Sequence, residues 1–357
     1  MRTQTIKKAL CSTLLCAASV VLFGQNGSGP FPRVASSEAI TKAVNDFKAA
    51  ARQAELDVHS LMVLHHGKVI AEFWQGEGAP DKPHVMHSVS KTFTATAIGF
   101  AVSERKLKVT DKVISFFPDK LPAEVSPYLK ELEIRHLLTM SAGQAVGADN
   151  RATNYNGNDD WVKIFLSLPI VHKPGTQHSY NSMATYMLSA IIQKVSGEKL
   201  IDYLTPRLFQ PLGIVGATWE ESSQGINFGG WGLYVKTEDM AKLGQLFLQK
   251  GRWNGKQLLP ESWIKEATTS HIASLPSGTT PEQAKNLDAT ENDWMQGYGY
   301  QMWRCRHNAV RADGAYGQFI IILPEQDALI VATSNVKDMP AELNLFWKYI
   351  FPQVSKN

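Results

Sequence analysis

The chain has 357 residues, of which 44% are apolar and 19% charged, and its 36 basic and 33 acidic side chains give a formal net charge of +3. This composition is typical of a globular protein and excludes an intrinsically disordered chain. Basic and acidic residues are mixed along the sequence, without the basic run that nucleic-acid-binding proteins carry. We therefore expect no nucleic-acid partner.

The N-terminal segment differs in composition from the rest of the chain. Basic residues within the first eight positions precede an apolar stretch from Ala9 to Phe23. This stretch is shorter than the roughly 20 residues that span a bilayer, so residues 1–24 are interpreted as a secretory signal peptide. Residues 25–33 would form a linker. The mature protein is expected to be periplasmic or secreted, without stable membrane insertion.

The cysteine content limits the covalent and metal chemistry that the chain can use. The three cysteines are Cys11, Cys16 and Cys305, and removal of the signal peptide would leave Cys305 alone. No intramolecular disulfide is then possible. A single cysteine without an H-E-x-x-H motif does not make a zinc site of the usual kind. We predict neither a metal nor a cofactor.

Apolar periodicity and turn residues predict the first elements. A helix is expected over Ser37–Glu55, and two apolar runs separated by His65–Lys68 predict a β-hairpin. A largely apolar helix is expected over Ser88–Lys106. Residues 107–227 combine helical patterns with proline-rich loops, and they include a polar loop from Gly147 to Asp160.

Strands return near the C-terminus, before a final helix over Ala341–Ile350. The expected strands are Gly299–Cys305, Gln318–Leu323 and Ala328–Ser334. We predict an α/β (α+β) fold in which an antiparallel sheet is flanked by N- and C-terminal helices. Residues 34–106 and 228–357 would form an α/β subdomain, and residues 107–227 a mainly helical one, within a single domain from 34 to 357.

Ser88 and Lys91 form an S-x-x-K motif, which on a helix places both side chains on one face. The spacing alone is weak evidence, because other matches begin at Ser103, Ser196 and Ser262. Ser88 alone follows an extended segment and begins a long apolar helix, where unpaired N–H groups and the helix dipole favour a nucleophile. The alternative is a helix-capping serine. A lysine can act as the base if its surroundings lower its pKa.

Three segments resemble motifs of the serine β-lactamase, DD-peptidase and esterase superfamily, the penicillin-recognising serine hydrolases. They are His87–Thr94, Pro174–Ser182 and Asp313–Gln318. The resemblance covers nearly the whole mature chain. It points to the class C-like branch near the 6-aminohexanoate-oligomer hydrolases and family VIII-type esterases, and it implies a β-lactamase/transpeptidase-like fold.

The resemblance also implies roles for individual residues. Ser88 would be the acylated nucleophile, with Lys91 and Tyr180 as its proton-handling partners. The backbone N–H groups of Ser88 and Ala315 would form the oxyanion hole, which typically provides several kcal/mol of transition-state stabilisation. A packed aromatic residue without a catalytic role is the alternative for Tyr180.

Two positions depart from the family pattern. Ser182 stands where the Y-x-N triplet has asparagine, and Ala312 stands where the K-T-G motif has its cation. Arg311 is adjacent, but neighbouring side chains of a strand point to opposite faces, so we do not expect it to replace that cation. Both departures argue against β-lactams and cell-wall peptides as main substrates.

Substrate contacts are expected from Ser182, Asp313 and Gly314. Gly314 would let substrate approach the strand backbone closely. Trp231 and Tyr155 are candidates for the wall of an acyl pocket, with core or loop packing as an equally good interpretation.

The sequence thus predicts an exported serine hydrolase that cleaves a small-molecule ester or amide through an acyl-enzyme. Three alternatives stay open. One is an acyltransferase that passes the acyl group to an alcohol or amine, and a second is a β-lactamase or DD-peptidase. The third is a non-enzymatic binding or sensor domain, which the joint presence of Ser88, Lys91 and Tyr180 makes the least expected.

Overall fold

The computed structural model of the chain describes residues 31–145 and 159–355. The expected signal peptide, most of the linker and Tyr155 lie outside these ranges. None of the helices within them is long and apolar enough to cross a membrane.

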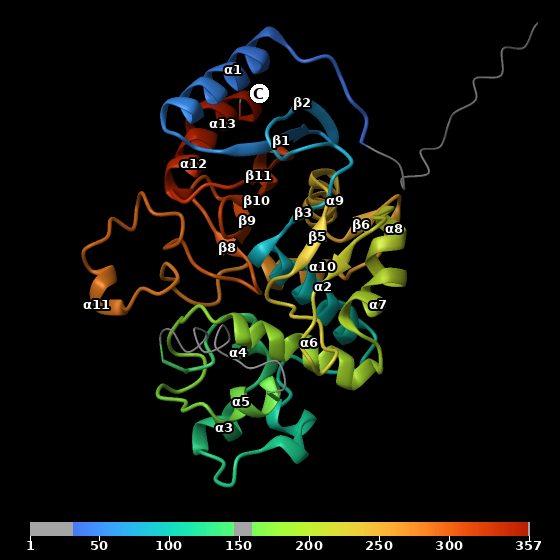
Figure 1. Cartoon of the computed structure of the whole chain (residues 1–357), viewed down its shortest axis with the longest axis vertical. Helices are drawn as coiled ribbons and strands as arrows, with labels where there is room; N and C mark the ends of the chain where they lie inside the picture. The colour runs from blue at the N-terminus through green and yellow to red at the C-terminus, as the bar shows by residue number, and fades with distance from the viewer. Residues whose placement is uncertain (1–30, 146–158, 356–357) are drawn as a thin grey trace, which may run out of the picture.

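A six-stranded antiparallel sheet forms the centre of the fold, with strand order β2-β1-β11-β10-β9-β8. Its strands are β1 (Val58–His65), β2 (Lys68–Trp74), β8 (Trp303–Arg304), β9 (Val310–Gly314), β10 (Gln318–Leu323) and β11 (Ala328–Ser334). The N-terminal hairpin pairs with the last strand of the chain, so segments from both ends build one sheet (Figure 1). The predicted α+β fold class is confirmed.

Both faces of this sheet are covered. Leu61 and Val63 of β1 pack with the N- and C-terminal helices, whereas Met62 and Leu64 face the layer that contains α9 (Thr237–Leu248). Because alternate residues of a strand point to opposite faces, a sheet buried on both sides needs apolar residues at every position. This explains the continuous apolar runs in the sequence.

The helices on the first face come from the two ends of the chain. Helix α1 (Glu38–Gln53) packs against α12 (Met339–Leu345), the π-helical turn Phe346–Ile350 and α13 (Phe351–Val354), as Figure 1 shows. Phe47 and Phe346 stack at a centroid distance of 5.1 Å. The expected terminal helix is thus confirmed, and it extends beyond the predicted limits at both ends.

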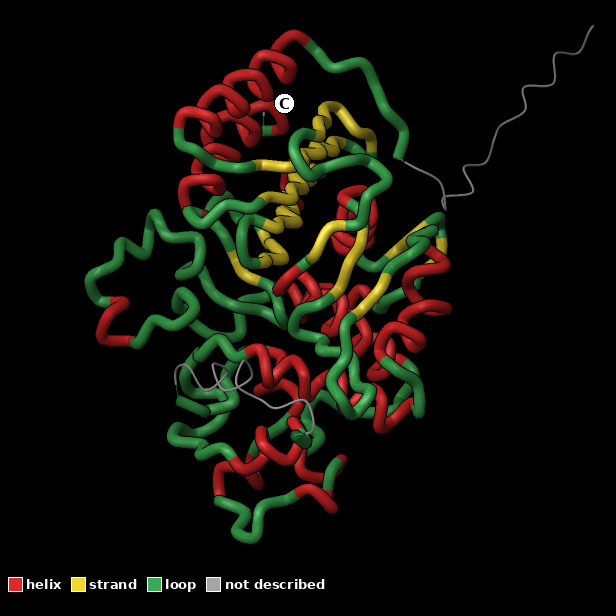
Figure 2. The backbone as a smooth tube through the Cα atoms, viewed as in Figure 1, coloured by secondary structure: helices red, strands yellow, loops and turns green. Residues whose placement is uncertain are grey.

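The middle of the chain consists mainly of helices and loops (Figure 2). The helices are α2 (Ser90–Ser103), α3 (Pro127–Glu131), α4 (Ile134–Leu138), α5 (Trp161–Ser167), α6 (Ser182–Ser196), α7 (Leu200–Leu204) and α8 (Gln210–Leu212), followed by α10 (Glu261–Thr268) and α11 (Pro281–Ala284). Further 3-10 and π turns span His87–Val89, Val113–Phe116, Pro118–Lys120, Thr205–Phe209 and Pro324–Gln326. The division into two subdomains stays a prediction.

Two small sheets are formed by short strands that lie between helices in the sequence. β3 (His84–Val85), β5 (Leu233–Val235) and β4 (Thr218–Trp219) form a three-stranded sheet, and β6 (Arg252–Trp253) pairs with β7 (Lys256–Gln257). The β3–β5 pairing is important for the site, because β3 leads directly into the segment that contains Ser88.

The prediction of a strand over Gly299–Cys305 is wrong except for Trp303 and Arg304, which are the residues of this segment that join the sheet. Gln301 has a left-handed backbone, with φ 59°. Its side-chain amide donates to the carbonyls of Leu137 and Leu138, both at 2.9 Å. These long-range contacts hold the segment against α4 instead of the sheet.

A buried carboxyl group connects β11 to α12. Glu342 is fully buried, and its Oε1 accepts a hydrogen bond from Ser334 Oγ at 2.5 Å. Its Oε2 has no hydrogen-bond partner among the described residues. Removal from water raises the pKa of Glu342 to about 8.

This pKa predicts a defined pH dependence of stability. The folded protein binds the Glu342 proton more tightly than the unfolded chain, whose glutamate pKa is 4.5. Its contribution to stability is therefore fully present below pH 4.5 and falls as the pH rises to about 8. The slope is at most about 1.4 kcal/mol per pH unit. Glu342→Gln should remove this loss, so the variant should gain stability relative to the parent between pH 5 and pH 8.

Urea unfolding of the parent and of Glu342→Gln at pH 5 and at pH 8 measures the difference in stability. The exposed Glu261 provides the control, because Glu261→Gln should shift stability equally at both. A Glu342→Gln difference that does not change with pH would contradict the prediction.

Candidate active site

Ser88 lies in a 3-10 turn, His87–Val89, which continues directly into α2. The Met86 N–H donates to the Leu233 carbonyl at 2.8 Å, which fixes the start of the turn against β5. The Val89 N–H then donates back to the Met86 carbonyl at 3.0 Å. The helix predicted from Ser88 therefore begins at Ser90, and Ser88 lies half-buried in the turn that precedes it.

Lys91 lies on the first turn of α2 and is only 2% exposed. Its Nζ donates to Ser88 Oγ at 2.9 Å, to Ser182 Oγ at 3.1 Å and to the Gly230 carbonyl at 2.7 Å. These three acceptors match the three hydrogens of an ammonium group. The structure thus brings Ser88, Lys91 and Ser182 together, as the sequence motifs led us to expect.

Gly230 is a member of this cluster that the sequence interpretation missed. A Cβ atom at Gly230 would lie 2.8 Å from the Ser182 carbonyl and 3.5 Å from Lys91 Nζ. The close approach to the Ser182 carbonyl excludes a side chain at this position, so glycine is required. The Gly229-Gly230 pair was the available sequence signal for this contact.

Tyr180 lies next to Lys91. It directly precedes Asn181, whose side chain caps α6 by accepting from the N–H groups of Met183 and Ala184 at 2.9 and 3.2 Å. The Tyr180 ring stacks on Trp303, with centroids 5.6 Å apart and an interplanar angle of 17°. Lys91 Nζ lies 4.9 Å from the centroid of the same ring.

The end of strand β9 packs against the nucleophile turn. A Cβ atom at Gly314 would lie 2.4 Å from the Met86 carbonyl and 3.2 Å from the Val89 nitrogen. We expected the absence of a side chain at Gly314 to let substrate approach the strand backbone. The structure corrects this expectation, because the chain's own nucleophile turn already fills that space. Ala315 follows at the exposed end of the strand.

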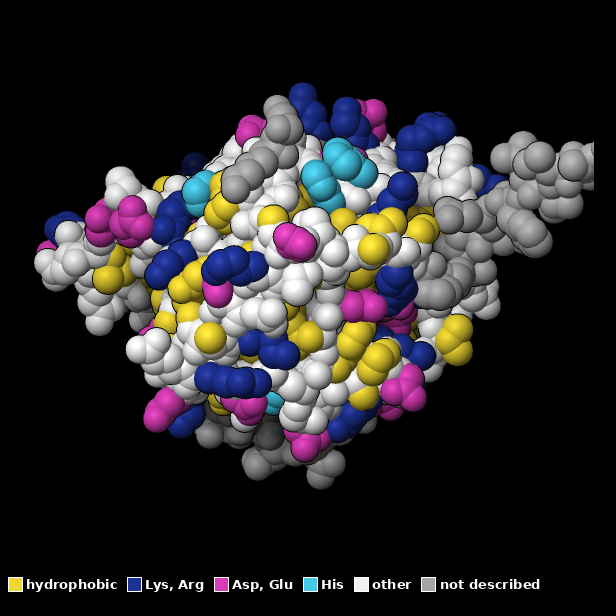
Figure 3. All heavy atoms as spheres, turned by 90° about the horizontal axis from the view of Figure 1, so that it is seen from above, with side chains coloured by type: hydrophobic (Ala, Val, Ile, Leu, Met, Phe, Trp, Pro, Cys, Tyr) yellow, Lys and Arg dark blue, Asp and Glu magenta, His cyan; other side chains and the backbone are white. Residues whose placement is uncertain are grey.

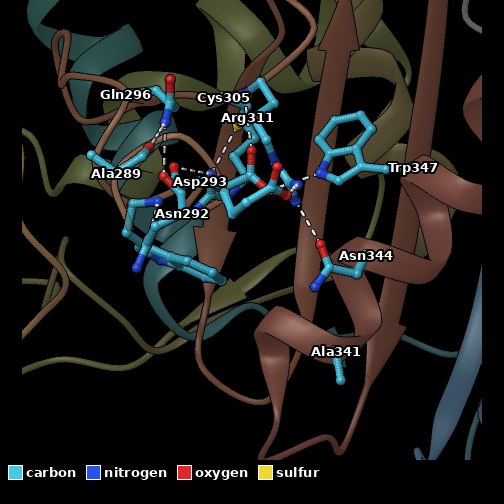
Figure 4. A network of polar contacts seen from close by, with 12 residues as sticks. Ala289, Asn292, Asp293, Gln296, Cys305, Arg311, Ala341, Asn344 and Trp347 are labelled. Carbon is cyan, nitrogen blue, oxygen red and sulfur yellow. Dashed lines mark hydrogen bonds and ion pairs between the residues drawn. The ribbon is translucent and has the colours of Figure 1, made fainter. Parts of the chain in front are cut away.

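Asp313, a predicted substrate contact, is bound by Arg311. Its Oδ2 accepts from Arg311 Nε at 3.0 Å and lies 2.8 Å from Nη2. Arg311 is fully buried, and its Nη1 also donates to the Asp293 carbonyl at 2.9 Å and to Cys305 Sγ at 2.8 Å (Figure 4). The guanidinium group is therefore held inside the protein, and it does not replace the cation missing at Ala312.

Cys305 is part of this buried cluster. Burial raises the pKa of the Cys305 thiol to about 11. At neutral pH it stays a protonated thiol, and it has no nucleophilic role in the site.

The two candidates for the pocket wall have different outcomes. Trp231 is partly buried and stacks on Phe228 and Trp161 at centroid distances of 4.7 and 6.1 Å. It belongs to an aromatic cluster directly after Gly230. Tyr155 lies outside the described residues.

Within residues 31–145 and 159–355, no group of three or more His, Cys, Asp or Glu side chains is arranged to hold a metal ion. The polar atoms around Ser88 come instead from a lysine, hydroxyl groups and backbone amides.

Comparison with known families identifies this arrangement. The family described as Beta-lactamase matches residues 46–351. The chain belongs to the Beta-lactamase family. It is a serine hydrolase of that superfamily.

Two curated relatives of this Beta-lactamase family member are named as a dimer hydrolase and an amidase. The 6-aminohexanoate-dimer hydrolase of Paenarthrobacter ureafaciens is 22% identical over 302 residues, covering 80% of this chain and 75% of the relative. The N-acetylmuramyl-L-alanine amidase of Bacillus subtilis is 21% identical over 420 residues, covering 95% and 92%.

The fold is shared with solved structures. EstCE1, described as a hydrolase with promiscuous acyltransferase activity, superposes with a TM-score of 0.70 at 16% identity, covering 87% of this chain and 100% of that one. At this identity the likeness concerns the fold alone.

Proposed function

We propose that this member of the Beta-lactamase family hydrolyses a small-molecule ester or amide through an acyl-enzyme on Ser88, with Lys91 and Tyr180 transferring protons. The observation that carries the proposal is the 2.9 Å contact between Lys91 Nζ and Ser88 Oγ, next to the end of strand β9. A nucleophile needs a base within hydrogen-bond distance, and this contact provides it.

The geometry allows Lys91 to act in this way. A neutral amine keeps two hydrogens, which can stay bound to Ser182 Oγ and the Gly230 carbonyl at 3.1 and 2.7 Å. Its lone pair then faces Ser88 Oγ. These two acceptors hold the amine in position while it takes the serine proton.

The proposed reaction has two stages. Ser88 Oγ attacks the substrate carbonyl as Lys91 takes its proton, and the resulting oxyanion is held by the N–H groups of Ser88 and Ala315. Tyr180 protonates the leaving group as its bond to carbon breaks. Water then attacks the acyl-enzyme as the deprotonated Tyr180 takes one of its protons, and the carboxylic acid leaves as Lys91 returns its proton to Ser88.

The absence of an available cation at positions 311 and 312 favours a substrate with a neutral acyl group. Ala312 is buried and apolar, and Arg311 is fully buried against Asp313. Neither residue offers a cation for the carboxylate that a β-lactam or a cell-wall peptide carries. We therefore place these two substrate classes second to simple esters and amides.

Transfer of the acyl group to an alcohol or amine is the second candidate function. Its support is EstCE1, which shares the fold and is described as a hydrolase with promiscuous acyltransferase activity. Transfer and hydrolysis share the acyl-enzyme and differ only in the group that attacks it.

Export and the absence of a nucleic-acid partner are also proposed. The support for export is the sequence of residues 1–24. Basic and acidic side chains are interspersed on the face shown in Figure 3, which does not favour nucleic acid. Cell fractionation would test the location.

The time course of p-nitrophenyl butyrate cleavage tests the main proposal. An initial burst is expected, with intact mass spectrometry showing one butyryl group and peptide mapping placing it on Ser88. Added alcohols would divert the product to their butyrate esters if transfer competes with water. A butyryl group on another residue would overturn the proposal. Faster turnover of a chromogenic cephalosporin than of the ester would favour the β-lactamase alternative.

A further inference from the structure

A pocket of about 320 Å³ adjoins the nucleophile turn. Its lining includes His84, His87, Tyr234, Tyr316 and Asn335. His87 directly precedes Ser88, and Tyr316 directly follows Ala315. The pocket is therefore bounded by the sequence neighbours of both proposed oxyanion-hole residues, and none of its lining side chains has a role in the proposed reaction.

His87 and Tyr316 share an unfavourable backbone conformation. Their φ angles are 43° and 64°, in the left-handed region that residues other than glycine seldom adopt. Glycine would avoid this strain, and the next residue in the chain, Gly317, is a glycine with φ 87°. Residues held in this region by the surrounding structure are enriched at active sites and ligand-binding positions.

The two strained side chains lie together. The rings of His87 and Tyr316 have centroids 5.3 Å apart and an interplanar angle of 59°. Tyr316 is 44% exposed, which is high for an aromatic residue. The pair thus presents an accessible aromatic surface beside the nucleophile.

The pocket carries little net charge. Burial lowers the pKa values of His84 and His87 below 6.5, so both rings are neutral at neutral pH. Glu77 and Lys82 of the lining pair with each other at 2.5 Å on the surface, and His59 Nε2 lies 3.1 Å from Asp57 Oδ2. An ion would gain little from these walls, whereas a neutral ring or amide can stack on Tyr316 and hydrogen-bond to Asn335.

We propose that this pocket is a substrate subsite for a neutral planar group, an aromatic ring or an amide, in the ester or amide cleaved at Ser88. The inference rests on the proposed function. The planar group can belong to the acyl part or to the leaving group of the substrate, because the pocket flanks the oxyanion hole from which both extend.

Two pairs of esters distinguish these positions. Methyl phenylacetate against methyl butyrate tests the acyl part, and benzyl acetate against butyl acetate tests the leaving group, with acid release followed by pH-stat. The aromatic ester of one pair should have a kcat/KM about tenfold higher. His87→Gly and Tyr316→Gly should each bring this ratio close to one.

The same substitutions separate a binding role from a structural one. Each relieves backbone strain, so the melting temperature should stay constant or rise. Arg105→Gly is the matched control, because Arg105 also has a left-handed backbone, with φ 57°, but lies exposed beyond the opposite end of α2. It should leave the aromatic preference unchanged. A preference that survives both pocket substitutions would overturn the proposal.

A second measurement does not require turnover. Phenylacetamide, a neutral planar compound, is titrated calorimetrically into the Ser88→Ala variant with and without Tyr316→Gly. Binding that weakens about tenfold with Tyr316→Gly supports the subsite. Absent or unaffected binding overturns it. If the parent cleaves neither the esters nor the corresponding amides, the proposed function fails, and the titration still decides the subsite.

Discussion

Ser88→Ala is expected to lower kcat/KM for p-nitrophenyl butyrate by about ten-thousand-fold or more and to remove the burst of p-nitrophenol. Without the hydroxyl group no acyl-enzyme can form, and Lys91 has no proton to accept. The backbone donors of the oxyanion hole stay in place, so a small residual rate above that of water is expected.

Ser262→Ala is the matched control for this variant. Ser262 and Lys265 form another S-x-x-K match, but Ser262 is exposed on α10. This substitution should leave both kcat and KM unchanged. Equal activity of Ser88→Ala and the parent would refute the assignment of the nucleophile, and equal loss in both variants would indicate a general effect on folding.

Arg311→Met is expected to lower the free energy of unfolding by about 3–5 kcal/mol, because it leaves the Asp313 carboxylate inside the protein without its cation. The Asp293 carbonyl would also lose a donor. Arg311 lies 4.3 Å from the ring centroid of Trp294 and 5.7 Å from that of Trp303, so these stacking contacts would change as well.

Urea unfolding followed by tryptophan fluorescence measures this loss. Arg105→Met, at an exposed position, is the control and should change stability by less than about 0.5 kcal/mol. Combining Arg311→Met with Asp313→Leu should recover part of the loss, because the uncompensated carboxylate is then absent. If Arg311→Met cost as little as the control, the buried pair would have no structural role.

A smaller loss of catalytic rate should accompany Arg311→Met. Trp303 packs between Arg311 and Tyr180, with its ring stacked on the tyrosine. Loss of the guanidinium would allow Trp303 to shift, and Tyr180 with it. Arg311 would thus act as a positioning residue, and its effect should appear mainly in kcat.

The sequence predicted the parts of the fold that depend on local patterns. The strands Gln318–Leu323 and Ala328–Ser334 have the predicted limits, because apolar runs end there at turn residues. The segment from Gly299 was wrong, since its conformation depends on hydrogen bonds from Gln301 to residues of α4 far away in the chain.

The same distinction applies to the site. Ser88 and Lys91 are three residues apart at the start of an apolar helix, so their contact could be predicted from the spacing together with the helix start. The Gly230 carbonyl reaches Lys91 from a distant loop, and the left-handed backbone of His87 leaves no local sequence signal. Such contacts depend on how separate segments meet, which composition and periodicity do not report.

The pairing of β1 with β11 has a consequence for biosynthesis. A ribosome produces the hairpin of β1 and β2 early, but its neighbour in the sheet, β11, is among the last segments to emerge. The nucleophile turn packs against the end of β9, which is also synthesised late. Premature termination before residue 328 would therefore leave an incomplete sheet with exposed edges, a form prone to aggregation and to proteolysis. Translation must be nearly complete before the active site can assemble.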